Sequence, residues 1–228
     1  MTDDVTIRHW RPLEPRHAPH AFALLKAAYS EPQRGYHNWD HVVDLFDKRE
    51  RYAHLATRPD LIDTAIFWHD SVYTTCDANG LLRSDLENVR ASAALFERHA
   101  RFDKTDTDVI HEMIMATANH LDASASREFY PGFARDLDLF LDLDLGSLAA
   151  SWPVFEKNLE RIQFEYSWVP EHVFCMGRLQ MLTTFAARGA GIYRLKETRE
   201  AWGEIAQANI ARAMIDLRAQ LASLASSA

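Results

Sequence analysis

The apolar segment Thr64–Trp68 runs directly into the doublet His69-Asp70. Helices rarely bury an imidazole and a carboxylate side by side, because burying a charge costs several kcal/mol unless the charge is paired or bound to a metal. One interpretation is a core histidine that is hydrogen-bonded to a neighbour. The other is a divalent cation, which a neutral histidine and an ionised aspartate can both ligate. The other histidines and aspartates of the chain favour the metal.

Apolar residues recur at helical spacing through most of the 228 residues, and glycine and proline are scarce at 8 each. Asn38 and Asp60 are candidate N-caps, and Gly189 is a candidate helix end. The pattern predicts an all-α fold, a helical bundle of roughly eight to ten helices. We expect one domain over residues 1–228, with residues 197–224 as a long C-terminal helix. The predicted helices span 15–29, 38–55, 60–70, 81–100, 103–120, 133–142, 152–166, 170–188 and 197–224.

The amino-acid composition excludes some classes of binding partner and cellular compartment. The formal net charge is −8, which argues against a nucleic-acid polymer held on a broad basic face, although a local basic pocket for one phosphate stays open. Cys76 and Cys175 form no CxxC motif, which favours a reducing compartment. We see neither a signal peptide nor a stretch long enough to span a membrane, so the prediction is a cytoplasmic protein. The C-terminal helix packs either on the core or on a second subunit of a homodimer.

Further metal-ligand types lie on both sides of the doublet. His37 and His41 are four residues apart, and positions i and i+4 share one face of a helix. His41 precedes an apolar pair and is the stronger ligand candidate, whereas His37 lies just before the helix. Downstream, Asp144 is either a ligand or an exposed helix cap, and Asp142 is the weaker alternative. His120 either complements a helix dipole or takes part in the site.

The order His41, His69-Asp70, Asp144 resembles the H…HD…D signature of the HD superfamily of metal-dependent phosphohydrolases. The surrounding residues resemble one bacterial branch of predicted HD phosphohydrolases, and the likeness covers roughly residues 15–217. The context that carries it is Tyr36 to Trp39, Phe67 to Tyr73, Glu87, Ser92-Ala93, Thr117, Asp142 to Leu145, Glu165-Tyr166, Arg178, Ile192-Tyr193 and Ala208 to Ile210.

The resemblance implies an all-α HD-type bundle in which four residues bind the metal. It also implies hydrolysis of a phosphoester, such as a nucleotide, by metal-activated water that Asp70 orients or deprotonates. Some HD nucleotidases carry a glutamate as general acid three residues after the doublet, where this chain has Tyr73. Glu87 is the best substitute, with a solvated helix glutamate as the alternative. The implied ligands are His41, His69, Asp70 and Asp144.

Three more residues are candidates for binding substrate or a second metal: His37, His120 and Arg178. Arg178 lies in an apolar helix, where it meets an anion or pairs with a buried carboxylate. Four aromatic residues flank the ligands and either pack in the core or stack on a base: Tyr36, Trp39, Trp68 and Tyr73.

The ligand types admit Mn, Fe, Ni, Co, Zn or Mg, at one or two ions per chain, with two histidines favouring a transition metal. The expected partner is a small phosphorylated molecule rather than a nucleic acid or a membrane. Three other functions stay open: a non-catalytic metal or nucleotide sensor, a di-iron oxygenase on the same fold, and a helical interaction protein with no metal.

Overall fold

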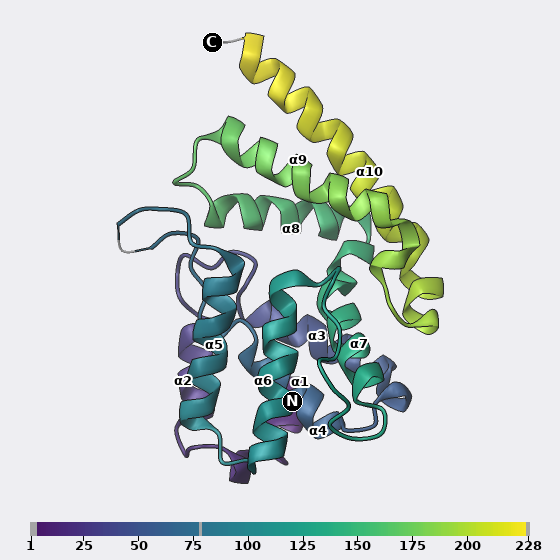
Figure 1. Ribbon diagram of the computed structural model, residues 1–228. Helices are drawn as coiled ribbons and strands as arrows, with labels where there is room; N and C mark the ends of the chain where they lie inside the picture. The colour runs from purple at the N-terminus through teal and green to yellow at the C-terminus, as the bar shows by residue number, and fades with distance from the viewer. Residues whose placement is uncertain (1–3, 78, 227–228) are drawn as a thin grey trace. The chain divides into compact units, whose positions relative to one another are not determined.

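The computed structural model describes residues 4–77 and 79–226, and over these residues it contains ten α-helices and no strand (Figure 1). The all-α prediction is therefore confirmed. The chain divides into two compact units, Met1–Asp144 and Leu145–Ala228. The expectation of one domain stays a prediction, and each unit is described by itself. Across the described residues, we find no helix that is both long and apolar enough to cross a membrane.

The first unit is built around α4. Every residue from Leu61 to Trp68 is buried, because α4 packs against α3, α5, α6 and α7. The apolar run of the sequence is thus the central helix of this unit, and α4 ends at Trp68 with His69 as its C-cap. Its helices are α1 (Val5–Trp10), α2 (Ala21–Ala28), α3 (Trp39–Arg51), α4 (Pro59–Trp68), α5 (Asp85–His99), α6 (Lys104–Ala116) and α7 (Phe133–Asp144).

Helix caps set the starts of the helices that carry the site. The predicted cap Asn38 is confirmed, since its side chain accepts a hydrogen bond from the Asp40 backbone N–H at 2.9 Å. The predicted cap Asp60 is wrong. Pro59 occupies the first helical turn, where a missing N–H costs nothing, and the N-cap is Arg58. The Asp60 carboxylate instead pairs with Arg58 and Arg16.

The amino-terminal region departs most from the predicted helices. The single helix expected over residues 15–29 is a 3₁₀ turn at Glu14–Arg16 followed by α2. Pro15 and Pro19 lack the N–H that a continuous helix needs. The sequence pattern did not predict α1, whose six residues are too few for a periodic signal. Asp4 caps α1 by accepting from the Thr6 N–H.

The second unit consists of α8 (Trp152–Glu165), α9 (Glu171–Arg188) and α10 (Lys196–Ser226), with α10 packed on α9 and α8. The predicted long C-terminal helix is confirmed. Of its apolar residues, Ile210, Met214 and Leu217 are buried, whereas Ile205 is exposed. Gly203 lets α10 approach Ala190, because an added Cβ would lie 2.9 Å from the Ala190 Cβ.

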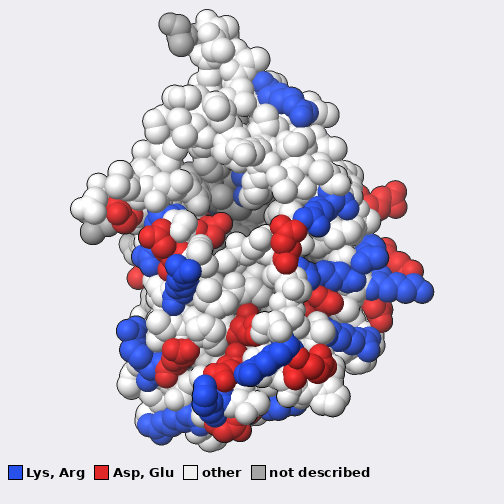
Figure 2. All heavy atoms as spheres, in the orientation of Figure 1, with Lys and Arg blue, Asp and Glu red and all other residues white. Residues whose placement is uncertain are grey.

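Charged residues of both signs alternate over the lower part of the face drawn in Figure 2. No extended surface of one sign is visible on that face. This mixed pattern agrees with the modest net charge of −8. The candidate site is therefore described from the interior of the first unit.

Candidate metal centre

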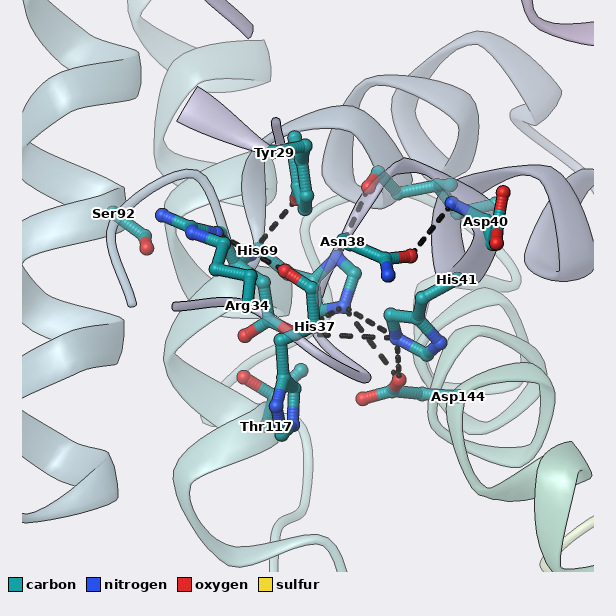
Figure 3. Close-up of polar contacts among 12 residues, drawn as sticks. Tyr29, Arg34, His37, Asn38, Asp40, His41, His69, Ser92, Thr117 and Asp144 are labelled. Atoms are coloured by element: carbon teal, nitrogen blue, oxygen red, sulfur yellow. Dashed lines mark hydrogen bonds and ion pairs between the residues drawn. The ribbon is translucent and has the colours of Figure 1, made fainter. Parts of the chain in front are cut away.

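Three helices of the first unit bring the four predicted ligands together, and Figure 3 shows three of them, His41, His69 and Asp144. His41 lies in the first turn of α3, which Asn38 caps. His69 and Asp70 follow the last residue of α4, and Asp144 is the last residue of α7. His41, His69 and Asp70 offer ligand atoms that all lie within 4.8 Å of one another. Helix ends thus converge on one small volume.

His69 presents a single nitrogen to this volume. Its Nδ1 lies 3.0 Å from the Ile66 carbonyl. A carbonyl only accepts hydrogen bonds, so Nδ1 carries the proton and a neutral ring keeps its lone pair on Nε2. This Nε2 lies 3.3 Å from Nε2 of His41. Two imidazole nitrogens that lack protons and lie this close together can both bind one metal ion. In metal sites, a backbone carbonyl commonly accepts the proton of the other ring nitrogen and so fixes the tautomer that binds the metal.

The distances among the four residues match a coordination shell. Two ligand atoms about 2.1 Å from one ion are about 3.0 Å apart at a right angle, about 3.4 Å at the tetrahedral angle and about 4.2 Å when opposite. His41 Nε2 lies 3.1 Å from Asp144 Oδ1 and 3.9 Å from Asp70 Oδ2. His69 Nε2 lies 3.2 Å from Asp70 Oδ2 and 3.6 Å from Asp144 Oδ1. All four separations fall within the range that one shared ion requires.

The electrostatics of the cluster favour a positive charge. Burial disfavours protonation of His69, yet the carboxylates of Asp70 and Asp144 outweigh it and raise the pKa of His69 well above its usual value. Burial likewise opposes ionisation of the two aspartates, yet the His69 charge lowers the pKa of both carboxyls. Two buried carboxylates that stay ionised need a compensating cation, and either a proton on His69 or a metal ion supplies it.

One buried atom of the cluster lacks a partner. No described residue hydrogen-bonds Nδ1 of His41. When Nε2 of a histidine ligates a metal, Nδ1 carries a proton that normally finds an acceptor. A buried polar group without a protein partner commonly binds an ordered water. The donor set and its spacing fit a divalent ion, and we expect a water at His41 Nδ1.

Two further predicted histidines lie at the edge of the cluster. His120 Nε2 lies 2.7 Å from Asp144 Oδ2, the oxygen opposite the one that faces His41. The His120 side chain is 21% exposed, so it is reachable from solvent. His37 stacks on Tyr73 with ring centroids 3.8 Å apart, and its charge helps to lower the pKa of Asp70. The structure thus brings both residues beside the ligands.

Asp144 rather than Asp142 faces the cluster. Two residues on a helix differ by about 200° in direction, so the two carboxylates point to different sides of α7. Asp142 is buried and, after the effect of burial itself, contributes to the raised pKa of Tyr52. The weaker of the two aspartate candidates is therefore a neighbour of Tyr52.

The structure does not bring Glu87 to the cluster. Its carboxylate accepts hydrogen bonds from the Ser84 N–H and hydroxyl and closes a capping box at the start of α5. The hydrogen bonds from Ser84 lower the pKa of Glu87, whereas a general acid needs a raised one. Ser84 and Glu87 are three residues apart, and that spacing alone predicts the box.

Arg178 belongs to α9 of the second unit, where a guanidinium N–H lies 3.3 Å from the Met181 sulfur. Its suggested role in substrate binding stays a prediction.

The sequence did not predict two residues that contact the site. Tyr29 and Arg34 hold the backbone of Asp70, and neither residue forms part of a pattern that could have identified it.

The aromatic residues around the site differ in what their rings contact. Trp68 is fully buried and donates its indole N–H to His17, so it belongs to the core. Tyr36 packs with its ring centroid 5.1 Å from that of His41. Of the four aromatic residues predicted to flank the ligands, Tyr36 and Tyr73 thus pack against histidines of the site.

Comparison with known proteins finds no matching family model and no significantly similar curated protein or solved structure.

Proposed function

We propose that this chain is a metal-dependent phosphohydrolase of the HD type. The observation that supports the proposal is the convergence of His41, His69, Asp70 and Asp144 at distances suited to one shared ion. The order of these residues in the sequence resembles the signature of that superfamily. Two imidazoles and two carboxylates favour a transition metal such as Mn, Fe, Co, Ni or Zn over Mg.

A divalent ion held by these four residues would supply an acidified water and polarise a phosphoryl oxygen. The chain's own residues would do the rest. The Asp70 carboxylate, whose pKa is lowered, stays ionised at neutral pH and accepts a hydrogen bond from the attacking water. His37 and His120 lie beside the ligands and would donate to phosphate oxygens as negative charge grows there. The partly exposed His120 ring marks the side from which a small phosphorylated molecule would enter.

The test begins with metal content. The purified protein is stripped with a chelator and reloaded with Mn²⁺, Co²⁺, Ni²⁺, Zn²⁺, Fe²⁺ or Mg²⁺, and bound metal is measured by elemental analysis. Phosphate release is then followed with phosphomonoesters, nucleoside mono- and triphosphates and cyclic nucleotides. We expect one or two ions per chain and a hydrolysis that the chelator abolishes and metal restores.

Two variants accompany the test. His69→Ala removes a ligand and should lose both metal and hydrolysis. His111→Ala is the matched control, because His111 is exposed and pairs with Glu97, so it should keep both. A wild-type protein that takes up no metal would contradict the proposal, because the proposed hydrolysis depends on a bound ion. Metal uptake without turnover of any phosphoester would instead favour a sensor, or an oxygenase if two irons are bound.

A further inference from the structure

Arg34 is a buried arginine outside the predicted site. It lies in the irregular segment between α2 and α3, and its side chain is only 1% exposed. A guanidinium carries a permanent charge and five N–H donors, and its burial is costly unless these donors find acceptors. What Arg34 contacts therefore indicates why it is buried.

Arg34 donates mainly to backbone carbonyls of the candidate metal centre. One terminal nitrogen lies 2.6 Å from the Asp70 carbonyl and 3.3 Å from the His37 carbonyl. The other terminal nitrogen lies 3.3 Å from the Ser71 carbonyl, and Nε donates to Glu31 at 2.9 Å. Figure 3 shows Arg34 beside Tyr29 and His37. One side chain thus joins the segment before α3 to the segment after α4.

The carbonyls of Asp70 and Ser71 follow the last residue of α4, Trp68. The last carbonyls at a helix end lack the N–H groups of a following turn, and the chain turns away from α4 directly after His69. The Arg34 guanidinium supplies the missing donors. It therefore fixes the turn on which Asp70 stands.

Tyr29 completes the arrangement from the other side. Its hydroxyl accepts a hydrogen bond from the Asp70 N–H at 3.2 Å, and its ring centroid lies 5.3 Å from the guanidinium of Arg34. Both backbone groups of Asp70 are thus held by side chains from residues 29–34. The two peptide units that flank the Asp70 Cα are each held by a side chain, and this fixes the backbone from which the carboxylate points toward His69.

We infer that Arg34, supported by Tyr29, is a positioning residue that presets Asp70 for metal binding. A guanidinium offers only donors, so Arg34 is not itself a metal ligand. It acts through the backbone of a ligand and that of His37. The inference rests on the metal centre of the proposed function, and it deepens that proposal by naming what holds the ligand geometry.

The chain offers a matched control in Arg49. Arg49 is also buried in the first unit, with a side chain 4% exposed, and it pairs with the Asp63 carboxylate at 3.0 Å. It contacts Asp63 on α4 rather than the backbone that carries Asp70. Replacing Arg49 should lower stability to a similar degree as replacing Arg34, without affecting the geometry of the metal ligands.

The experiment measures Co²⁺ binding to the full chain, since the visible absorption of Co²⁺ reports its coordination. The variants are Arg34→Met, Arg34→Lys, Tyr29→Phe and Arg49→Met, and thermal unfolding of each metal-free protein is recorded alongside. Loss of a group that orients a ligand typically costs about 10–100-fold in metal affinity. We expect this loss and an altered spectrum for Arg34→Met, with smaller losses for Arg34→Lys and Tyr29→Phe. Arg49→Met should bind Co²⁺ as the wild type does.

The outcomes separate the inference from the proposed function. A wild type that binds Co²⁺ and an Arg34→Met variant with the same affinity and spectrum would overturn the positioning role, even if its melting temperature falls. A wild type that binds no Co²⁺ would overturn the metal centre and the inference together. If Arg34→Met does not fold, Arg34→Lys and Tyr29→Phe decide. Unchanged affinity and spectrum in both would overturn the inference, and weakened binding would support it.

Discussion

Two buried histidines lie close to Trp68 in the first unit, and they differ in what their second nitrogen faces. His17 Nδ1 donates to the Leu13 carbonyl at 2.9 Å, and His17 Nε2 accepts the Trp68 indole N–H at 3.1 Å. His69 Nδ1 donates to the Ile66 carbonyl in the same way, but its Nε2 faces the carboxylates of Asp70 and Asp144. Burial is nearly the same, at 2% and 1% exposed.

The comparison separates a core histidine from a candidate ligand. Burial lowers the pKa of His17 to about 4, and its neutral partners do not reverse that effect. Burial acts on His69 in the same direction, but two carboxylates reverse it and raise the pKa. Burial alone therefore does not identify a functional histidine. The deciding feature is a second nitrogen directed at carboxylates instead of a neutral hydrogen-bond partner.

The largest expected difference between the two histidines is in metal content. His69→Gln removes a ligand nitrogen from the cluster, and loss of a supporting group alone already costs about 10–100-fold in metal affinity. We therefore expect Co²⁺ affinity to fall by more than about 100-fold in His69→Gln. His17→Gln should keep its affinity, because the hydrogen-bond partners of His17 are Leu13 and Trp68, which are not candidate ligands. Isothermal titration of both variants measures this, and equal losses would break the comparison.

The sequence predicts the parts of the site that depend on local signals, and it does not predict the contacts between residues that are far apart in the chain. The apolar run before His69 and the cap Asn38 are local signals, so α4, α3 and the candidate ligands on them could be predicted without a structure. Asp144 over Asp142 depends on the rotation of α7, which the Leu-Asp alternation leaves undetermined. The role of Glu87 stays a prediction, although its spacing from Ser84 indicates the capping box that the structure shows. Arg34 could not be predicted, since its role depends on carbonyls 36 and 37 residues away in the chain.

The next expected effect is on the pH dependence of stability. The folded-state pKa of His17 is about 4, below its usual 6.5, so the unfolded chain binds more protons between these values. Stability from neutral His17 is therefore complete above about pH 6.5 and is lost as the pH falls toward 4, by about 3 kcal/mol in total.

Urea unfolding of metal-free wild type and His17→Gln, measured from pH 4 to pH 7.5, isolates this contribution. The difference between the two free energies of unfolding should shrink as the pH falls. Groups other than His17, including His69, affect both proteins and cancel in the difference. A constant difference over this range would show that His17 does not titrate as its surroundings require.

The smallest expected effect is on stability, and it comes from a comparison of two carboxylates, Glu87 and Asp144. Glu87 contacts a neutral partner, Ser84, at an exposed helix start, whereas Asp144 contacts His41 and His120. Ser84→Ala should cost about 1 kcal/mol of stability through loss of the cap, and Glu87→Gln should lower the melting temperature less. Neither should change metal content or phosphate release. A Glu87→Gln variant that melts like the wild type but loses hydrolysis would restore Glu87 as a candidate acid, and it would show that contact with a neutral partner does not exclude a functional role.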